Sequence, residues 1–78
     1  MTTESFIKDI EELVRDRPNN DVLRVAETHG RRGSIYMDYD PVCDMHHIWT
    51  GNEDFNRAFE SLEKGVKYFE KMYNLIGE

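Results

Sequence analysis

Apolar and polar positions alternate with two different periods, which divide the chain into five expected elements. Near the N-terminus, apolar residues recur at helical spacing from Phe6 to Val14, with charged residues between them. This pattern predicts an amphipathic helix. Thr2 or Thr3 can cap its start. The helix is expected to end before Pro18, because the residue that precedes a proline avoids the helical region.

Residues 21–29 allow two interpretations. A strand places Leu23 and Val25 on one face, and the glycine-flanked residues 30–33 that follow are typical of a turn into another strand. The alternative is a helix capped by Asn20. We favour the strand, because Val22 and Val25 are β-branched. The helix would reduce the sheet to a single hairpin.

A hairpin around Pro41 is predicted from residues 34–39 and 43–49. The distribution of apolar and acidic side chains between its two faces indicates its register. A three-residue loop pairs Asp40 with Asp44 and separates apolar from acidic side chains, as burial of one face requires. The expected inner face is then Ile35, Met37, Tyr39, Met45, His47 and Trp49, and the expected outer face is Tyr36, Asp38, Asp40, Asp44, His46 and Ile48. Two like charges would sit opposite each other, and a longer loop would relieve this.

Seven apolar residues near the C-terminus follow one another with alternating steps of four and three: Phe55, Phe59, Leu62, Val66, Phe69, Tyr73 and Ile76. Such heptad spacing predicts one helix from about Glu53 to Ile76. Thr50 and Glu53 fit a capping box at its start. Gly65 in its middle would permit close approach of another backbone or mark a bend.

The element order is therefore α, β, β, β, α. We expect a single α+β domain over residues 1–78, with a three-stranded antiparallel sheet and two helices packed on one of its faces. The single cysteine, Cys43, excludes an intrachain disulfide. No apolar run approaches the ~18 residues that a membrane span needs, and the acidic N-terminus is unlike a signal peptide. We expect a cytoplasmic protein, in its own cell or in a host cell.

Charge is the strongest functional signal. The net charge is −6, and residues 34–55 contain five acids and no Lys or Arg. Direct binding to a nucleic-acid backbone needs concentrated basic residues, so this function is disfavoured. An acidic surface instead suits a basic protein partner. The expected partner-binding residues are Tyr36, Asp38, Asp40, Asp44, His46, Ile48, Glu53 and Asp54, with Tyr36 and Ile48 as apolar anchors.

Metal and catalytic chemistry centre on residues 38–47, which hold six ligand-type side chains. Cys43 and His46 have a spacing that zinc sites use, but His46 and His47 are strand neighbours and point to opposite faces. Nearby aspartates also disfavour a reactive thiolate. We therefore expect no enzyme activity, no metal and no cofactor, and we keep a small metal site at Cys43 and His46 as an alternative.

Two resemblances bear on function. The α-β-β-β-α order resembles the double-stranded-RNA-binding domain, but residues 52–55 (Asn-Glu-Asp-Phe) replace that family's basic cluster at the start of its last helix. In size, acidity and lack of a catalytic motif, the chain resembles small phage and mobile-element inhibitors of host defence, such as anti-CRISPR and DNA-mimic proteins. That resemblance implies that Asp38, Asp40, Asp44, Glu53 and Asp54 occupy a nucleic-acid channel lined by Lys and Arg.

The leading hypothesis is thus a non-enzymatic module whose acidic sheet face docks on a basic protein surface. The alternative is an assembly protein that forms a homodimer. In that case a second apolar line on the last helix, Tyr68, Met72 and Leu75, would make the contact.

Overall fold

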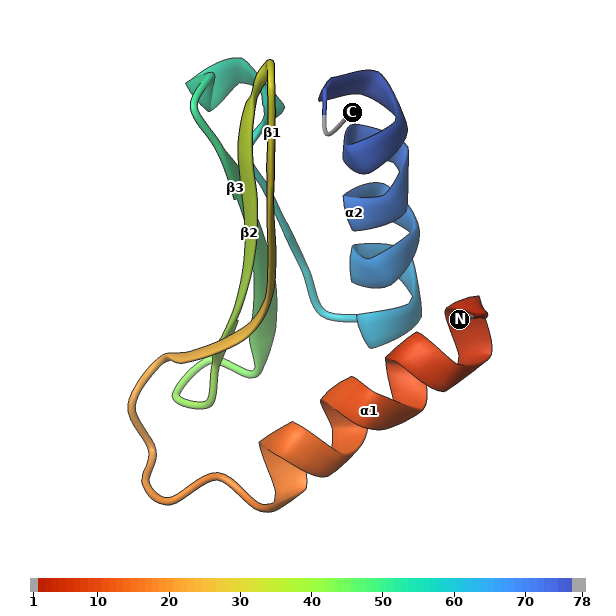
Figure 1. Cartoon of the computed structure of the whole chain (residues 1–78). Coiled ribbons are helices and arrows are strands. Elements are labelled where there is room, and N and C mark those ends of the chain that lie inside the picture. The colour runs from red at the N-terminus through yellow and green to blue at the C-terminus, as the bar shows by residue number, and fades with distance from the viewer. Residues whose placement is uncertain (1, 77–78) are drawn as a thin grey trace.

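The protein is an α+β fold in which two helices accompany a four-stranded antiparallel sheet (Figure 1). This is a computed structural model, and it describes residues 2–76. The elements are α1 (Thr3–Arg15), β1 (Leu23–Gly30), β2 (Gly33–Asp40), β3 (Met45–Thr50), the 3-10 helix η1 (Glu53–Phe55), β4 (Arg57–Phe59) and α2 (Leu62–Ile76). The strands follow one another in the order β1-β2-β3-β4. The predicted fold class is confirmed, whereas the predicted count of three strands was one too low.

Helix α1 forms where the sequence pattern predicts it. The hydroxyl of Thr2 accepts a hydrogen bond from the Ser5 amide at 3.1 Å, which satisfies one of the amides at the helix start. At the other end, the guanidinium of Arg17 donates to the carbonyl oxygen of Val14 at 2.6 Å. This bond closes the helix just before Pro18, as the proline rule requires.

Residues 23–30 form strand β1, so the strand interpretation is confirmed over the helix. A bulge lies between Arg24 and Ala26, where the pairing with β2 shifts by one residue. Strict alternation would place Ala26 on the face opposite Val25. The bulge instead lets both side chains contact the core.

The β2–β3 hairpin corrects the predicted register. Asp40 pairs with Met45, so the loop holds four residues, 41–44, and not three. A carboxylate oxygen of Asp40 accepts from the Val42 amide at 3.0 Å, and Asp44 adopts a left-handed conformation with φ of 54°. The hydroxyl of Tyr39 holds Asp44 through a 2.6 Å hydrogen bond. The longer loop keeps Asp40 and Asp44 from facing each other.

A one-residue change of register moves every side chain of a strand to the other face. Strand β3 therefore turns His46 and Ile48 toward the core, where both are buried. Met45, His47 and Trp49 lie on the opposite face. The predicted facing was correct for β2 and wrong for β3.

The last helix starts later than predicted. The side chain of Asn52 caps η1, and that of Asn56 accepts from the Thr50 amide at 2.8 Å, so the segment before β4 is held as a loop. Helix α2 begins after Ser61, whose carbonyl oxygen accepts from the Gly65 amide. The predicted capping box at Thr50 and the helix between 53 and 61 were therefore wrong.

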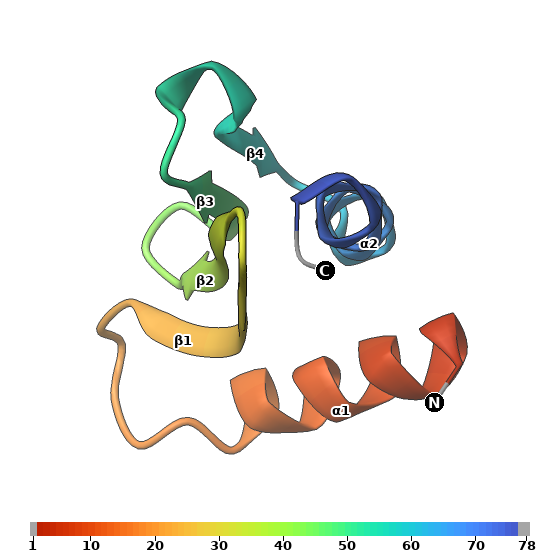
Figure 2. The same cartoon turned by 45° about the horizontal axis from the view of Figure 1, so that its top comes forward.

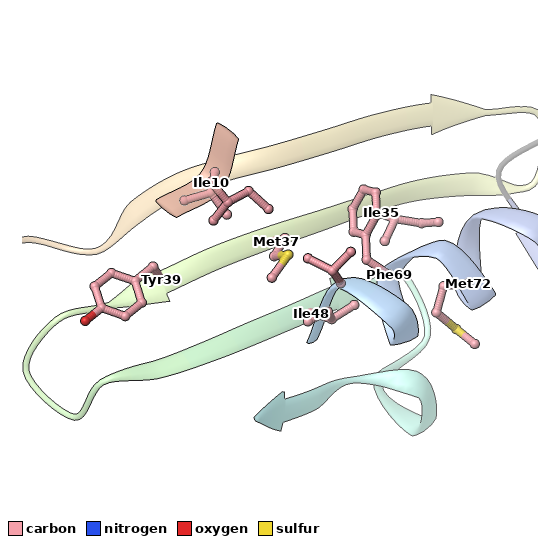
Figure 3. Packing of buried hydrophobic residues seen from close by; sticks show 9 residues of the cluster. Ile10, Ile35, Met37, Tyr39, Ile48, Phe69 and Met72 are labelled. Atoms are coloured by element: carbon pink, nitrogen blue, oxygen red, sulfur yellow. The ribbon is translucent and has the colours of Figure 1, made fainter. Parts of the chain in front are cut away.

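The core lies between the sheet and the helices. Helix α2 contacts β2 and β3, and α1 contacts β1 and α2 (Figures 1 and 2). Figure 3 shows the buried side chains that meet there: Ile10, Ile35, Met37, Tyr39, Ile48, Phe69 and Met72, together with Val25 and Val66. A Cβ atom on Gly65 would lie 3.2 Å from Met37 Cε and 3.4 Å from His46 Cβ, so this glycine marks the close approach of α2 to the sheet.

Candidate functional site

The sheet has a second face, opposite the one that α2 contacts, and we call it the outer face. In Figure 2 the ribbon of neither helix passes over it. Its side chains include Arg24, Glu27 and His29 from β1, Tyr36, Asp38 and Asp40 from β2, Met45, His47 and Trp49 from β3, and Ala58 from β4, which pairs with His47. An uncovered sheet face of this kind is available to a partner.

Aromatic rings form a row along the middle of the outer face. Tyr36 and Trp49 are directly paired across β2 and β3. The ring of His47 stacks on that of Trp49, with centroids 5.6 Å apart and planes 13° apart, and His29 meets Tyr36 edge-on at 5.7 Å. We call these four residues the aromatic row. Trp49 keeps 42% of its surface exposed, which is high for the largest apolar side chain.

Arg24 organises the charges at one side of this row. Its guanidinium bonds to Asp38, pairs with Glu27 at 3.1 Å, and lies over the ring of Tyr36 with 4.4 Å to the centroid. Asp38 is only 9% exposed and already has a basic partner. Its predicted role as a presented carboxylate is therefore wrong. Sequence reasoning did not single out Arg24, and only the β1–β2 register, which puts it opposite Asp38, reveals it.

The remaining acids lie at the two ends of β3 and do not form one continuous surface. Asp40 and Asp44 border the hairpin loop before the strand, and Glu53 and Asp54 lie on η1 after it. Asp44, Glu53 and Asp54 are exposed, and Asp40 is half-buried. The predicted acidic face is thus replaced by an aromatic row between two acidic clusters.

His46 and Ile48 cannot belong to a docking surface, since the structure buries both of them. Ile48 is fully buried, and His46 is 6% exposed. Burial lowers the pKa of His46 below the usual histidine value. Its ring lies 5.0 Å from that of Tyr39, and its Nδ1 is buried without a hydrogen-bond partner among the described residues.

The hairpin brings together a different set of ligand-type side chains from the one predicted. Ligand atoms of Asp40, Cys43 and His47 all lie within 4.8 Å of one another, and we call these three residues the hairpin cluster. The alternative metal site at Cys43 and His46 is contradicted, because the one-residue register change buries His46 and brings His47 to Cys43 instead.

The hairpin cluster does not activate its cysteine. Desolvation and a hydrogen bond to the Asp40 carboxylate raise the pKa of Cys43. The Val42 amide and the Cys43 thiol lower the pKa of Asp40. A thiol with a raised pKa is a poor nucleophile, which counts against cysteine catalysis at this position.

The three residues of the predicted self-association patch on α2, Tyr68, Met72 and Leu75, do not form one exposed surface. Met72 is 2% exposed and belongs to the core. The hydroxyl of Tyr68 donates to the Phe55 carbonyl oxygen, and its ring packs on Phe59 at 5.5 Å. Of these three residues, only Leu75 is exposed, at 52%. Self-association itself stays a prediction, but Met72 is excluded from its surface.

Comparison with known proteins gives no relative: no family model, no curated protein and no solved structure matches the chain. Among residues 2–76, neither helix combines the length and the apolar character that crossing a bilayer requires.

Proposed function

We propose that the chain is a non-enzymatic protein-binding module whose outer face docks on a basic protein surface. The observation that carries this proposal is the pairing of Trp49 with Tyr36 on an uncovered sheet face. Trp, Tyr and Arg are enriched among the residues that dominate the energetics of protein interfaces, and Trp and Tyr bury much area at a low entropic cost. Here all three residue types adjoin one another, with Arg24 stacked on Tyr36.

The acidic clusters define the partner's chemistry. Asp40 and Asp44 flank one end of the aromatic row, and Glu53 and Asp54 flank the other. Carboxylates at the rim of an interface accelerate encounter with a positively charged partner and select against acidic ones. The outer face would fit a surface lined by Lys and Arg, such as that of a nucleic-acid-binding protein. An inhibitor of such a protein is the role that these features favour.

A capture experiment tests whether Trp49 anchors the partner. The immobilised chain is incubated with native cell extract, bound protein is eluted in a salt gradient from about 0.1 to 0.5 M, and eluted proteins are identified by mass spectrometry. We expect a basic protein that is lost with Trp49→Ala. Tyr73→Ala is the matched control, since Tyr73 has the same 42% exposure but lies on α2. Retention of the partner by Trp49→Ala would overturn the proposal.

A second pair of variants tests the charge. Glu53→Lys/Asp54→Lys should weaken capture and reduce its salt dependence, since Asp40 and Asp44 remain at the other end of the row. Glu11→Lys/Glu12→Lys changes the net charge by the same amount on the exposed side of α1 and should bind as the wild type does. If both double variants weakened binding of the partner equally, net charge alone would explain the effect. That result would contradict a localised acidic rim. Asp38 is unsuitable for this test because it is bonded to Arg24.

A further inference from the structure

The hairpin cluster has a donor set that is unusual for a surface turn. It combines a carboxylate from the last residue of β2, a thiol from the loop and an imidazole from β3, all within 4.8 Å. Around a tetrahedral zinc ion, ligand atoms lie roughly 3.3–3.8 Å apart, given Zn–S and Zn–N bonds of about 2.3 and 2.1 Å. Side-chain rotation alone can close a difference of about 1 Å.

Two of these donors are held in place by contacts outside the cluster. The Val42 amide donates to Asp40 Oδ1 at 3.0 Å and orients that carboxylate. The His47 ring lies flat against Trp49 with an angle of 13° between the planes. Partners of this kind fix the orientation of metal ligands and strengthen binding.

We infer that Asp40, Cys43 and His47 bind one Zn²⁺ ion at the hairpin end of the outer face. A thiolate, an imidazole and a carboxylate suit zinc, whereas Ca²⁺ and Mg²⁺ prefer oxygen ligands throughout. Three protein ligands leave the fourth tetrahedral position to a water molecule or to a side chain of another protein. The inference is independent of the docking proposal, since it rests on ligand chemistry and not on a partner.

Zinc and cobalt alone are the probes. The purified chain, freed of metal with a chelator and kept reduced, is titrated with Zn²⁺ by calorimetry, with an expected stoichiometry of one ion per chain. Co²⁺ should give the near-ultraviolet absorption of a cobalt–thiolate bond, which added Zn²⁺ abolishes. Co²⁺ should also quench the fluorescence of Trp49, the only tryptophan, because its ring lies 5.6 Å from that of His47.

Single variants identify the ligands. Residues that merely orient a ligand change metal affinity 10- to 100-fold, so Cys43→Ser, His47→Gln and Asp40→Asn should each weaken Zn²⁺ binding by at least about tenfold. His29→Gln is the matched control, as His29 is an exposed histidine of the same face outside the cluster. Circular dichroism and melting without metal show whether each variant is folded.

Three results would overturn the inference: no binding of either metal, binding that Cys43→Ser leaves unchanged, or a cobalt complex without the thiolate band. Glu53→Lys/Asp54→Lys separates this site from the docking proposal. That variant should bind Zn²⁺ as the wild type does, whereas it should lose the basic partner.

Discussion

Tyr36 and Trp49 lie directly opposite each other on the outer face, and the next pair along the same two strands, Met37 and Ile48, is fully buried on the inner face. Strands β2 and β3 thus contribute to the core with one set of side chains and to a candidate docking surface with the alternate set. Because the two sets are separate, substitutions on the outer face should affect binding more than folding.

Replacing Trp49 with alanine should lower the free energy of unfolding only modestly. A cross-strand pair contributes about 0.2–1 kcal/mol, and stacking on His47 adds a similar amount at most. Met37→Ala, which empties part of the core, should cost about 2–5 kcal/mol. Urea unfolding followed by circular dichroism measures both. A loss for Trp49→Ala as large as that for Met37→Ala would show that Trp49 is part of the core.

Substitutions at Gly65 should reveal how closely α2 approaches the sheet. Alanine gains about 1 kcal/mol of helix propensity, but its Cβ would lie 3.2 Å from Met37 Cε, so the net change should stay within about 1 kcal/mol. Valine adds two more carbons in the same space and should destabilise by about 2 kcal/mol or more. Gly51→Ala is the control for crowding, since nothing lies within 4 Å of its Cβ. Equal stability of the valine and alanine variants, measured by urea unfolding, would contradict the close packing.

The β2–β3 hairpin shows which part of the fold could not be predicted from the sequence, namely the register of β3. Periodicity placed β2 correctly, but β3 offers an apolar residue to either face, with Trp49 on one and Ile48 on the other. The choice depends on loop length, and that depends on the Asp40–Val42 bond and the left-handed Asp44. Neither the hydrogen bond nor the left-handed conformation can be inferred from the pattern of apolar residues. The hairpin cluster was missed for the same reason, because the register decides which histidine meets Cys43.

The C-terminal segment shows a second limit of hydrophobic spacing. Phe55 and Phe59 fit the heptad with Leu62, yet they belong to η1 and β4. Side-chain bonds from Asn and Ser to the backbone compete with helix formation. Asn56 makes such a contact with the Thr50 amide, whereas the Ser61 hydroxyl oxygen accepts from the Lys64 amide and caps the start of α2. Ser61 directly before Leu62 was a readable N-cap signal, and its use would have shortened the predicted helix.

His46 should make stability fall in mild acid. Burial lowers its pKa in the folded state, so the unfolded chain takes up a proton at a higher pH than the folded chain does. The free energy of unfolding should therefore decrease as the pH falls below about 6.5, by at most about 1.4 kcal/mol per pH unit for this one proton, until the folded state is protonated too.

Urea unfolding at several pH values in the presence of a chelator measures this slope. His46→Leu removes the titrating group and should flatten the curve between about pH 5 and 7. His29→Gln removes an exposed histidine of the same sheet and is the matched control variant. An unchanged slope in His46→Leu would assign the acid sensitivity to other groups.

Arg24 and Asp38 should be coupled more strongly than an ordinary surface ion pair. Asp38 is nearly buried, and Arg24 bonds to it while stacking on Tyr36, so loss of Arg24 leaves the Asp38 carboxylate poorly solvated. Arg24 is itself about half exposed, so solvent screening limits the effect. A double-mutant cycle with Arg24→Met and Asp38→Asn should give a coupling energy of about 1 kcal/mol. The exposed pair Glu63–Lys67 on α2 is the matched reference and should give a weaker coupling, because solvent screens both charges. Equal coupling in the two cycles would mean that burial of Asp38 adds nothing to the pair, and Arg24 would then be available to contact a partner.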